Sequence, residues 1–228
     1  MRKIVIGDIH GCFLTLKKLL EEKVKIKADD ELYFVGDYVD RGPQSKHVID
    51  YILDLKEKQP KVICLRGNHE QLMLDSVNGD AEFKHWMKNG GDETLGSFGA
   101  ETINDLDEKY QLFFDTLDYY CEEDHYIIVH AGLNFMLQNP FEDFYSMMWI
   151  RKFPVDEKWL NGRILVHGHT TKRKTLIKED FENPECSVIN IDSGCIYNHK
   201  QGLGNLCAFD MMNRKLFFQK KVDGPSGK

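Results

Sequence analysis

The sequence has no run of about twenty apolar residues, so it predicts no membrane-spanning helix. Its six cysteines form no Cys-x-x-Cys pair, and some lie in strand-like apolar runs, which favours reduced core thiols over disulfides or a zinc knuckle. The chain has no excess of positive charge: 30 Lys and Arg residues are outnumbered by 37 Asp and Glu residues, and the formal net charge is -7. This charge argues against broad binding to nucleic acids or anionic membranes. An anionic substrate would therefore need a site that is locally positive.

The chain also lacks repeats, low-complexity tracts and linkers. Its 228 residues, 42% of them hydrophobic, can form one substantial core, so we expect a single domain over residues 1–222. Residues 223–228 are expected to be a disordered tail. Residues 1–6 begin like a signal peptide, but Asp8 and His10 come too soon for its apolar segment. We therefore expect a first strand there and a cytoplasmic protein.

Apolar runs typical of strands alternate with helical patterns in the N-terminal part of the chain. This alternation is typical of a βαβαβ series and predicts parallel strands. The strands are expected at residues 4–6, 32–35 and 62–65, and the helices near residues 13–22 and 46–58.

Residues 71–124 show no clear β periodicity and contain glycine-rich turns, so we expect helices and loops that form a cap. Strand-like runs then resume and supply the second half of a sheet sandwich. They are expected at residues 126–129, 164–166, 188–191, 206–209 and 215–219. The predicted fold class is α/β, an α+β sandwich of two β-sheets flanked by helices, with a small helical cap.

Polar motifs begin where five of the predicted strands end. The carboxyl ends of strands are where sites assemble in open α/β folds, because the following loops converge there while the sheet holds them rigid. The motifs are GDIHG at residues 7–11, GDYVDRG at 36–42, RGNHE at 66–70, HAGL at 130–133 and HGHT at 167–170.

The residues in these motifs predict a two-metal centre. Asp8 and His10 are two residues apart on an extended segment, so both side chains can chelate one ion. Asp37 could bridge two ions. The second ion would be completed by Asn68, His130 and His169. Oxygen and nitrogen ligands without thiolate suit Mn, Fe or Zn better than Ca, and six ligands are too many for one metal.

Each of these residues also has a structural interpretation when taken alone. Asp8 could cap a helix, Asn68 could form an Asx-turn, and His130 could be a core histidine. Five such motifs at five strand ends favour a site instead. His167 is left open, because it neighbours His169.

The five motifs, in this order, resemble the signature of PPP-type phosphoprotein phosphatases, within the calcineurin-like metallophosphoesterase superfamily. The resemblance covers residues 3–170 and is closest to short bacterial and bacteriophage members. Gly168-His169 is followed by Thr170 rather than by the x-His of the wider superfamily, as in the PPP branch. The resemblance implies Asp8, His10 and Asp37 on the first metal, and Asp37, Asn68, His130 and His169 on the second.

Two cations that share Asp37 would activate a bridging water for direct attack on phosphorus and neutralise the phosphoryl oxygens. No cysteine stands in a Cys-x5-Arg loop that would suggest a covalent phosphoenzyme. His69 follows the ligand Asn68 and is predicted to be the general acid, with Asp40 fixing its tautomer. The resemblance assigns this pair the same task.

Arginine side chains are predicted to clamp the substrate phosphate, because guanidinium binds it in bidentate fashion. The candidates are Arg41, inside GDYVDRG, and Arg151, whose MMWIR context resembles the W-x-R element of bacterial members. Asn68 is a further candidate. Arg66 is expected to be structural and to pair with carboxylates behind the site.

The predicted activity is that of a metal-dependent phosphomonoesterase. We expect a Ser/Thr protein phosphatase that carries two divalent ions, Mn first with Fe or Zn as alternatives, and acts on phosphoproteins, phosphopeptides and small aryl phosphates. One alternative is a symmetrical diadenosine tetraphosphate hydrolase. That group shows Ala and Asp where this chain has Asp40 and Glu70, which favours the phosphatase. The other is a non-catalytic protein-binding scaffold, which would be expected to lose ligands.

Overall fold

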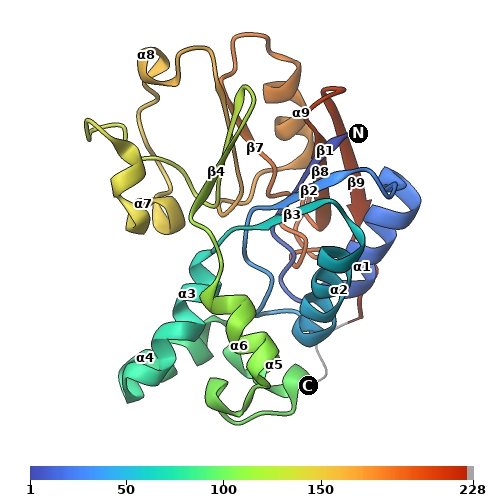
Figure 1. The fold of residues 1–228 in the computed structure, drawn as a ribbon, viewed down its shortest axis with the longest axis vertical. Coiled ribbons are helices and arrows are strands. Elements are labelled where there is room, and N and C mark those ends of the chain that lie inside the picture. The colour runs from blue at the N-terminus through green and yellow to red at the C-terminus, as the bar shows by residue number, and fades with distance from the viewer. Residues whose placement is uncertain (225–228) are drawn as a thin grey trace.

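Nine strands form two sheets in a computed structural model that describes residues 1–224 (Figure 1). The five-stranded sheet has the order β3-β2-β1-β8-β9, and the four-stranded sheet has the order β4-β5-β6-β7. The strands of the first sheet are β1 (Lys3–Ile6), β2 (Glu31–Phe34), β3 (Lys61–Cys64), β8 (Asn205–Asp210) and β9 (Lys215–Lys220). Those of the second are β4 (Tyr120–Glu123), β5 (Tyr126–Val129), β6 (Ile164–His167) and β7 (Val188–Asn190).

The predicted βαβαβ series is present. Strands β1, β2 and β3 are parallel, and β5, β6 and β7 are parallel in the second sheet. Helix α1 (Phe13–Lys18), continued by the π-helical segment η1 (Leu19–Val24), connects β1 to β2, and α2 (Ser45–Lys58) connects β2 to β3. The first three parallel strands therefore end at one edge, where their loops can meet.

Strand alternation divides the core into layers. In β1, Ile4 and Ile6 pack in the cluster that also contains α1 and α2, whereas Val5 joins a cluster to which both sheets contribute. In the second sheet, Ile128 joins that same intersheet cluster, and Val129 faces a third cluster with the helix after β5. The two-sheet sandwich predicted from the sequence is confirmed.

The cap consists of helices that follow β3 and gather below the sheets in Figure 1. They are α3 (Asn68–Asp75), η2 (Ser76–Asn78), α4 (Asp80–Trp86), the π-helical η3 (Met87–Gly91), α5 (Asp92–Phe98), η4 (Ile103–Asp105) and α6 (Glu108–Asp115). Its predicted end at residue 124 is wrong, because β4 occupies the last residues of that stretch and pairs with β5. This edge strand is only partly buried and ends in Glu122 and Glu123, so it has no apolar run to reveal it.

Four helical elements after β5 were not expected from the sequence. They are η5 (Pro140–Glu142), α7 (Phe144–Trp149), α8 (Glu157–Leu160) and α9 (Lys174–Glu182). Within residues 1–224, no helix is long and apolar enough to span a bilayer. The six cysteines are free thiols, four of them buried.

The expected disordered tail is wrong at its first residue. Asp223 is buried, and its carboxylate accepts hydrogen bonds from the backbone N–H groups of Leu14 (2.8 Å) and Thr15 (3.0 Å). The Thr15 hydroxyl donates to the same carboxylate. Asp223 thus caps the start of α1 from the other end of the chain. Residues 225–228 lie outside the described residues.

Candidate metal centre and acid pair

All six predicted metal ligands lie together, each on the loop or helix start that follows a strand. Asp37 is the common member of two buried groups. One group adds His10 and His69, and the other adds His130 and His169. Within each group the ligand atoms lie within 4.8 Å of one another. Asp8 and Asn68 are also buried. The His and Asp clusters thus have the form of a binuclear metal site.

Asp37 and Asn68 stand between the histidines. The Asp37 carboxylate lies 3.5 Å from His10 Nε2 through one oxygen and 3.4 Å from His130 Nε2 through the other. The Asn68 side-chain oxygen lies 3.2 Å from His130 Nε2 and 2.8 Å from His169 Nδ1. Nitrogen and oxygen donors from the ends of five separate strands therefore converge on one small volume.

The residues fit divalent ions in three respects. Asp8 Oδ1 and His169 Nε2 are buried and have no hydrogen-bond partner within residues 1–224. Burial lowers the pKa of His10 and His130, and that of His169 to about 3, so the imidazoles are neutral at pH 7 and can donate lone pairs. Burial and the charges of Asp192 and Asp37 raise the pKa of Asp8, and cations would relieve this crowding.

The backbone around the site is strained. Within residues 1–224, nine non-glycine residues have a positive φ, and five of them are His10 (47°), Asp37 (52°), Asp40 (69°), Arg41 (67°) and His169 (66°). Such left-handed conformations cost free energy and persist only where surrounding contacts enforce them. Their concentration here indicates that the loops are bent to aim these side chains.

Glu70 provides much of that enforcement. Its buried carboxylate accepts hydrogen bonds from the backbone N–H groups of Asp37 (2.9 Å), Tyr38 (2.8 Å), Val39 (3.3 Å) and Gly67 (3.0 Å). The start of α3 is thereby tied to the loop after β2. This anchoring role of Glu70 was not predicted from the sequence.

The predicted acid pair is assembled. His69 Nδ1 lies 2.7 Å from Asp40 Oδ2, and the two side chains are 2% and 0% exposed. His69 is also close enough to His10 and Asp37 to be grouped with them as a ligand, which the sequence did not predict. Because Asp40 engages Nδ1, only Nε2 of His69 is free to meet a substrate or an ion.

Asp192 was missed by sequence reasoning. It follows β7, is buried, and accepts a hydrogen bond from the backbone N–H of Gly194 (2.8 Å). Burial raises its pKa to about 7, and the charges of Asp37, Arg41 and Arg151 also act on it. An acidic residue directly after the predicted strand 188–191 is the same signal that revealed Asp8 and Asp37, so Asp192 could have been found.

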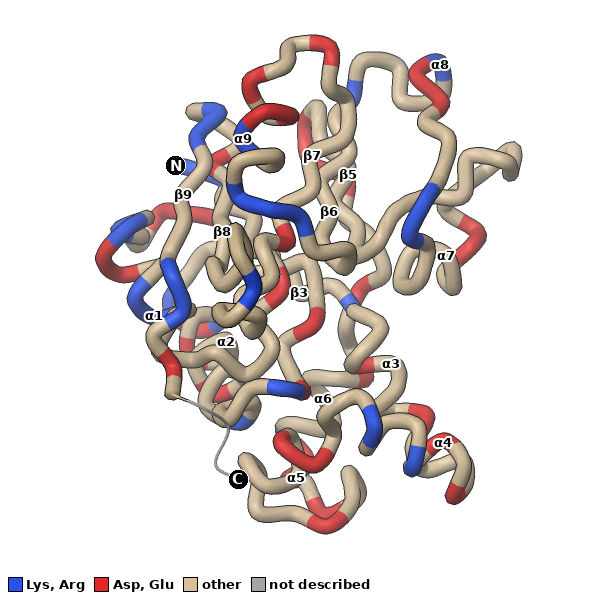
Figure 2. The backbone as a smooth tube through the Cα atoms, turned by 180° about the vertical axis from the view of Figure 1, so that it is seen from behind, with Lys and Arg blue, Asp and Glu red and all other residues tan. Residues whose placement is uncertain are grey.

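The two predicted phosphate clamps border the site. Arg41 Nη1 lies 3.0 Å from His10 Nε2, so the guanidinium reaches into the ligand cluster. Arg151 is exposed. Its positive charge also lowers the pKa of His130 and His169, but less than burial does. Figure 2 shows basic segments beside α7 and α9, although the chain as a whole is acidic.

His167 is separate from the metal groups. Its Nδ1 lies 3.0 Å from the carbonyl oxygen of Gly168, and burial lowers its pKa to about 4. It lines a hollow of about 580 Å³ together with Arg151, Lys152 and Thr170. His167, whose role the sequence left open, is thus a neutral imidazole in the wall of this hollow.

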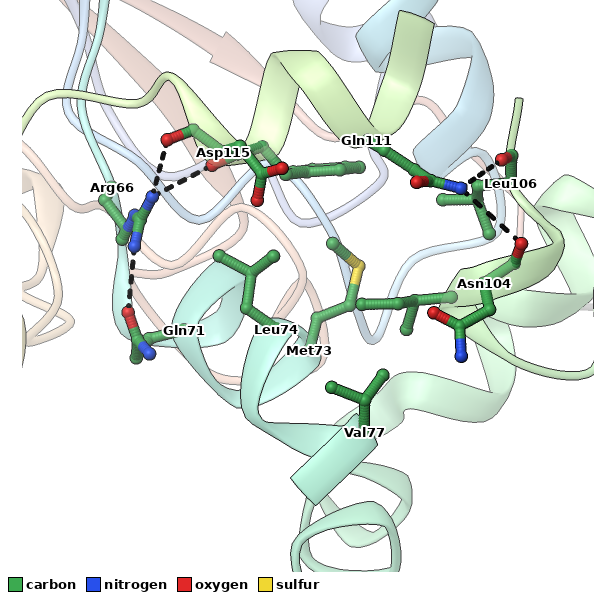
Figure 3. A pocket seen from close by; sticks show the side chains of 11 residues that line it. Arg66, Gln71, Met73, Leu74, Val77, Asn104, Leu106, Gln111 and Asp115 are labelled. Atoms are coloured by element: carbon green, nitrogen blue, oxygen red, sulfur yellow. Dashed lines mark hydrogen bonds between the residues drawn. The ribbon is translucent and has the colours of Figure 1, made fainter. Parts of the chain in front are cut away.

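Arg66 is structural, as expected, but its partners are not carboxylates. Its guanidinium donates to the side-chain oxygen of Gln71 and to the backbone carbonyls of Phe114 and Asp115 (Figure 3). These contacts join the start of α3 to the end of α6. They border a hollow of about 370 Å³ whose lining includes no predicted ligand, acid or clamp.

Comparison with known proteins assigns the family. The calcineurin-like phosphoesterase family matches residues 1–201, and the chain belongs to this family. Together with the buried His and Asp groups, this defines a metallophosphoesterase, a hydrolase of phosphoesters. The family and fold predicted from the sequence are confirmed.

Two curated relatives and one solved structure are similar to this chain. Serine/threonine-protein phosphatase 1 of Salmonella typhimurium is 29% identical over 209 residues, 89% of this chain and 90% of the relative. A symmetrical bis(5'-nucleosyl)-tetraphosphatase of Dechloromonas aromatica is 36% identical over 138 residues, but these cover 58% of this chain and 44% of the relative. The solved structure of a protein serine/threonine phosphatase from Saccharomyces cerevisiae matches with a TM-score of 0.67 at 17% identity, covering 100% of this chain and 82% of that one.

Proposed function

We propose that this chain is a Ser/Thr protein phosphatase that hydrolyses phosphomonoesters of proteins and peptides, and small aryl phosphates. The observation that carries the proposal is the buried Asp40–His69 pair beside the metal groups. The near full-length similarity to a bacterial serine/threonine-protein phosphatase supports it. The proposed metals are two divalent ions, and Mn is the preferred candidate.

The proposed ligands are the side chains that surround Asp37. They are Asp8, His10, Asp37, Asn68, His130 and His169. When bound, the two ions supply a hydrolytic water activated at neutral pH and positive charge for the phosphoryl oxygens. Neutral imidazoles and an Asp37 that faces both histidine groups suit this role.

His69 is proposed to give a proton from Nε2 to the oxygen of the departing alcohol. Asp40 accepts the Nδ1–H hydrogen bond, so it fixes the orientation and the tautomer of the ring. Serine and threonine alkoxides are poor leaving groups and need this proton. Arg41 and Arg151 would hold the phosphate oxygens in line with the attacking water.

The second candidate is a symmetrical dinucleoside tetraphosphatase, which the 36% identity over part of the chain favours. A dinucleoside polyphosphate expels a much better leaving group, so it depends less on an acid held by a carboxylate. Asp40 and His69 therefore favour the monoester. A purely structural scaffold is disfavoured, because the whole predicted ligand set is present and buried.

The test compares a phosphoserine peptide with diadenosine tetraphosphate at one Mn concentration, in the parent and in Asp40→Ala. We expect the parent to have the higher kcat/KM on the peptide, and Asp40→Ala to reduce this preference because peptide turnover falls more. If the parent prefers the dinucleotide by tenfold, about 1.4 kcal/mol in the barrier, the second candidate replaces the first.

A further inference from the structure

The carboxylate of Asp40 is held by two cap residues as well as by His69. The Trp86 indole N–H lies 3.0 Å from Asp40 Oδ1 and 3.1 Å from Oδ2, and the Thr94 hydroxyl donates to Oδ1 at 2.7 Å. Trp86 ends α4 and Thr94 lies in the first turn of α5. All four residues are at most 1% exposed.

Thr94 also fixes the backbone beneath the carboxylate. Its hydroxyl oxygen accepts the backbone N–H of Asp40 at 2.8 Å while the hydroxyl donates to the Asp40 side chain. Asp40 has a φ of 69°, so its backbone is in the left-handed region. One threonine hydroxyl thereby restrains both the main chain and the side chain of Asp40 in a conformation that is otherwise costly.

The turn between these two cap residues is shaped to bring them close. Gly90 has a φ of 103°, and a Cβ there would lie 2.5 Å from the backbone nitrogen of Arg41. A Cβ on Gly91 would lie 2.6 Å from the Trp86 ring. Gly90 and Gly91 therefore have to lack side chains so that the cap can approach both Asp40 and Arg41.

From these contacts we infer that Trp86 and Thr94 are positioning residues for the proton donor, acting through Asp40 on His69. The inference rests on the proposed function, because it requires His69 to be the acid. A carboxylate has about four acceptor sites. With the indole and the hydroxyl in place, Oδ2 is left pointing at His69 Nδ1. Without them the carboxylate can turn about its Cβ–Cγ bond, and the imidazole loses its orientation.

Thr94→Val is the central test, because it removes the hydroxyl at nearly constant volume. The variant should lose roughly tenfold in kcat on a phosphoserine peptide, the usual size of an outer-shell effect. The loss on p-nitrophenyl phosphate should be at most about threefold, because that leaving group needs little protonation. KM and Mn content should be unchanged. Trp86→Phe, which keeps a ring but removes the N–H, should show the same pattern.

Two control variants separate positioning from loss of structure. Thr94→Ser retains the hydroxyl and should restore the peptide rate. Ser97→Ala, also on α5, removes the acceptor of the Lys46 backbone N–H (2.9 Å), so it weakens the cap without touching Asp40. Ser97→Ala should lower the unfolding temperature and leave the ratio of peptide to aryl rates as in the parent.

The inference is overturned if Thr94→Val and Trp86→Phe slow both substrates equally, if neither slows the peptide, or if Thr94→Ser fails to restore it. A parent that hydrolyses no phosphoserine peptide refutes the proposed function and the inference together. If His69→Asn shows the leaving-group dependence and Thr94→Val does not, the proposed function stands and only the positioning role fails.

Discussion

The metal half and the acid half of the site are built in different ways. The ligands come from loops at the ends of β1, β2, β3, β5 and β6, where the sheets fix their positions. Asp40 instead depends on Trp86 and Thr94, which lie 46 and 54 residues further along the chain in cap helices. Metal loading and leaving-group protonation should therefore be separable by mutation.

Asp37→Ala should have the largest effect, because only Asp37 faces both histidine groups. We expect loss of bound Mn and a fall in turnover beyond about 10⁴-fold, above what loss of an acid alone produces. His10→Ala should be milder. Metal analysis and turnover are measured on the same samples, after chelation and after Mn is restored. Equal metal content and rate in Asp37→Ala and the parent would refute the two-metal centre.

His69→Asn should separate the two halves most clearly. It should retain both metals and lose roughly 10²–10⁴-fold on alkyl phosphates, with a smaller loss on aryl phosphates. The readout is a plot of rate against the leaving-group pKa, with metal content as the control. Loss of an ion would instead identify His69 as a ligand, as its distance from His10 and Asp37 allows.

Glu70→Gln should have the smallest effect. It should weaken the metal half and the acid half together, because Glu70 anchors the loop that carries both Asp37 and Asp40. The amide retains one acceptor oxygen but presents a donor to backbone N–H groups. We expect destabilisation by about 1–3 kcal/mol, and Mn affinity and both substrates weakened in parallel. Urea unfolding and a Mn titration test this. A selective loss on alkyl phosphates would place Glu70 in the acid half alone.

The sequence predicted the parts of the site that follow directly from strand ends. Asp8, Asp37, Asn68, His130 and His169 come after apolar runs, and alternation along a strand is a local signal. The two-sheet sandwich and the parallel strands were predicted from the same apolar runs. The sequence also allowed the pairing of Asp40 with His69, because the family resemblance placed both in known motifs.

What the sequence did not reveal depends on contacts between distant segments. Nothing near Trp86 or Thr94 indicates that their polar atoms meet Asp40, since aromatic and hydroxyl residues are ordinary in a cap helix. Strand β4 is a half-exposed edge, so it has no periodic apolar signal. Asp223 looked like part of a polar tail because its partners, Leu14 and Thr15, are at the other end of the chain.

The left-handed residues of the site have a consequence for how such a chain can change over time. Each non-glycine residue held there costs on the order of 1–3 kcal/mol. Glycine would adopt the same backbone without that cost, but it would remove the side chain that carries the chemistry. A chain that no longer hydrolysed phosphoesters could therefore recover this backbone cost at His169, whose buried Nε2 has no hydrogen-bond partner within residues 1–224, by carrying glycine there. The histidine at this position is thus accounted for by its side chain and not by its backbone conformation, which glycine would adopt at lower cost.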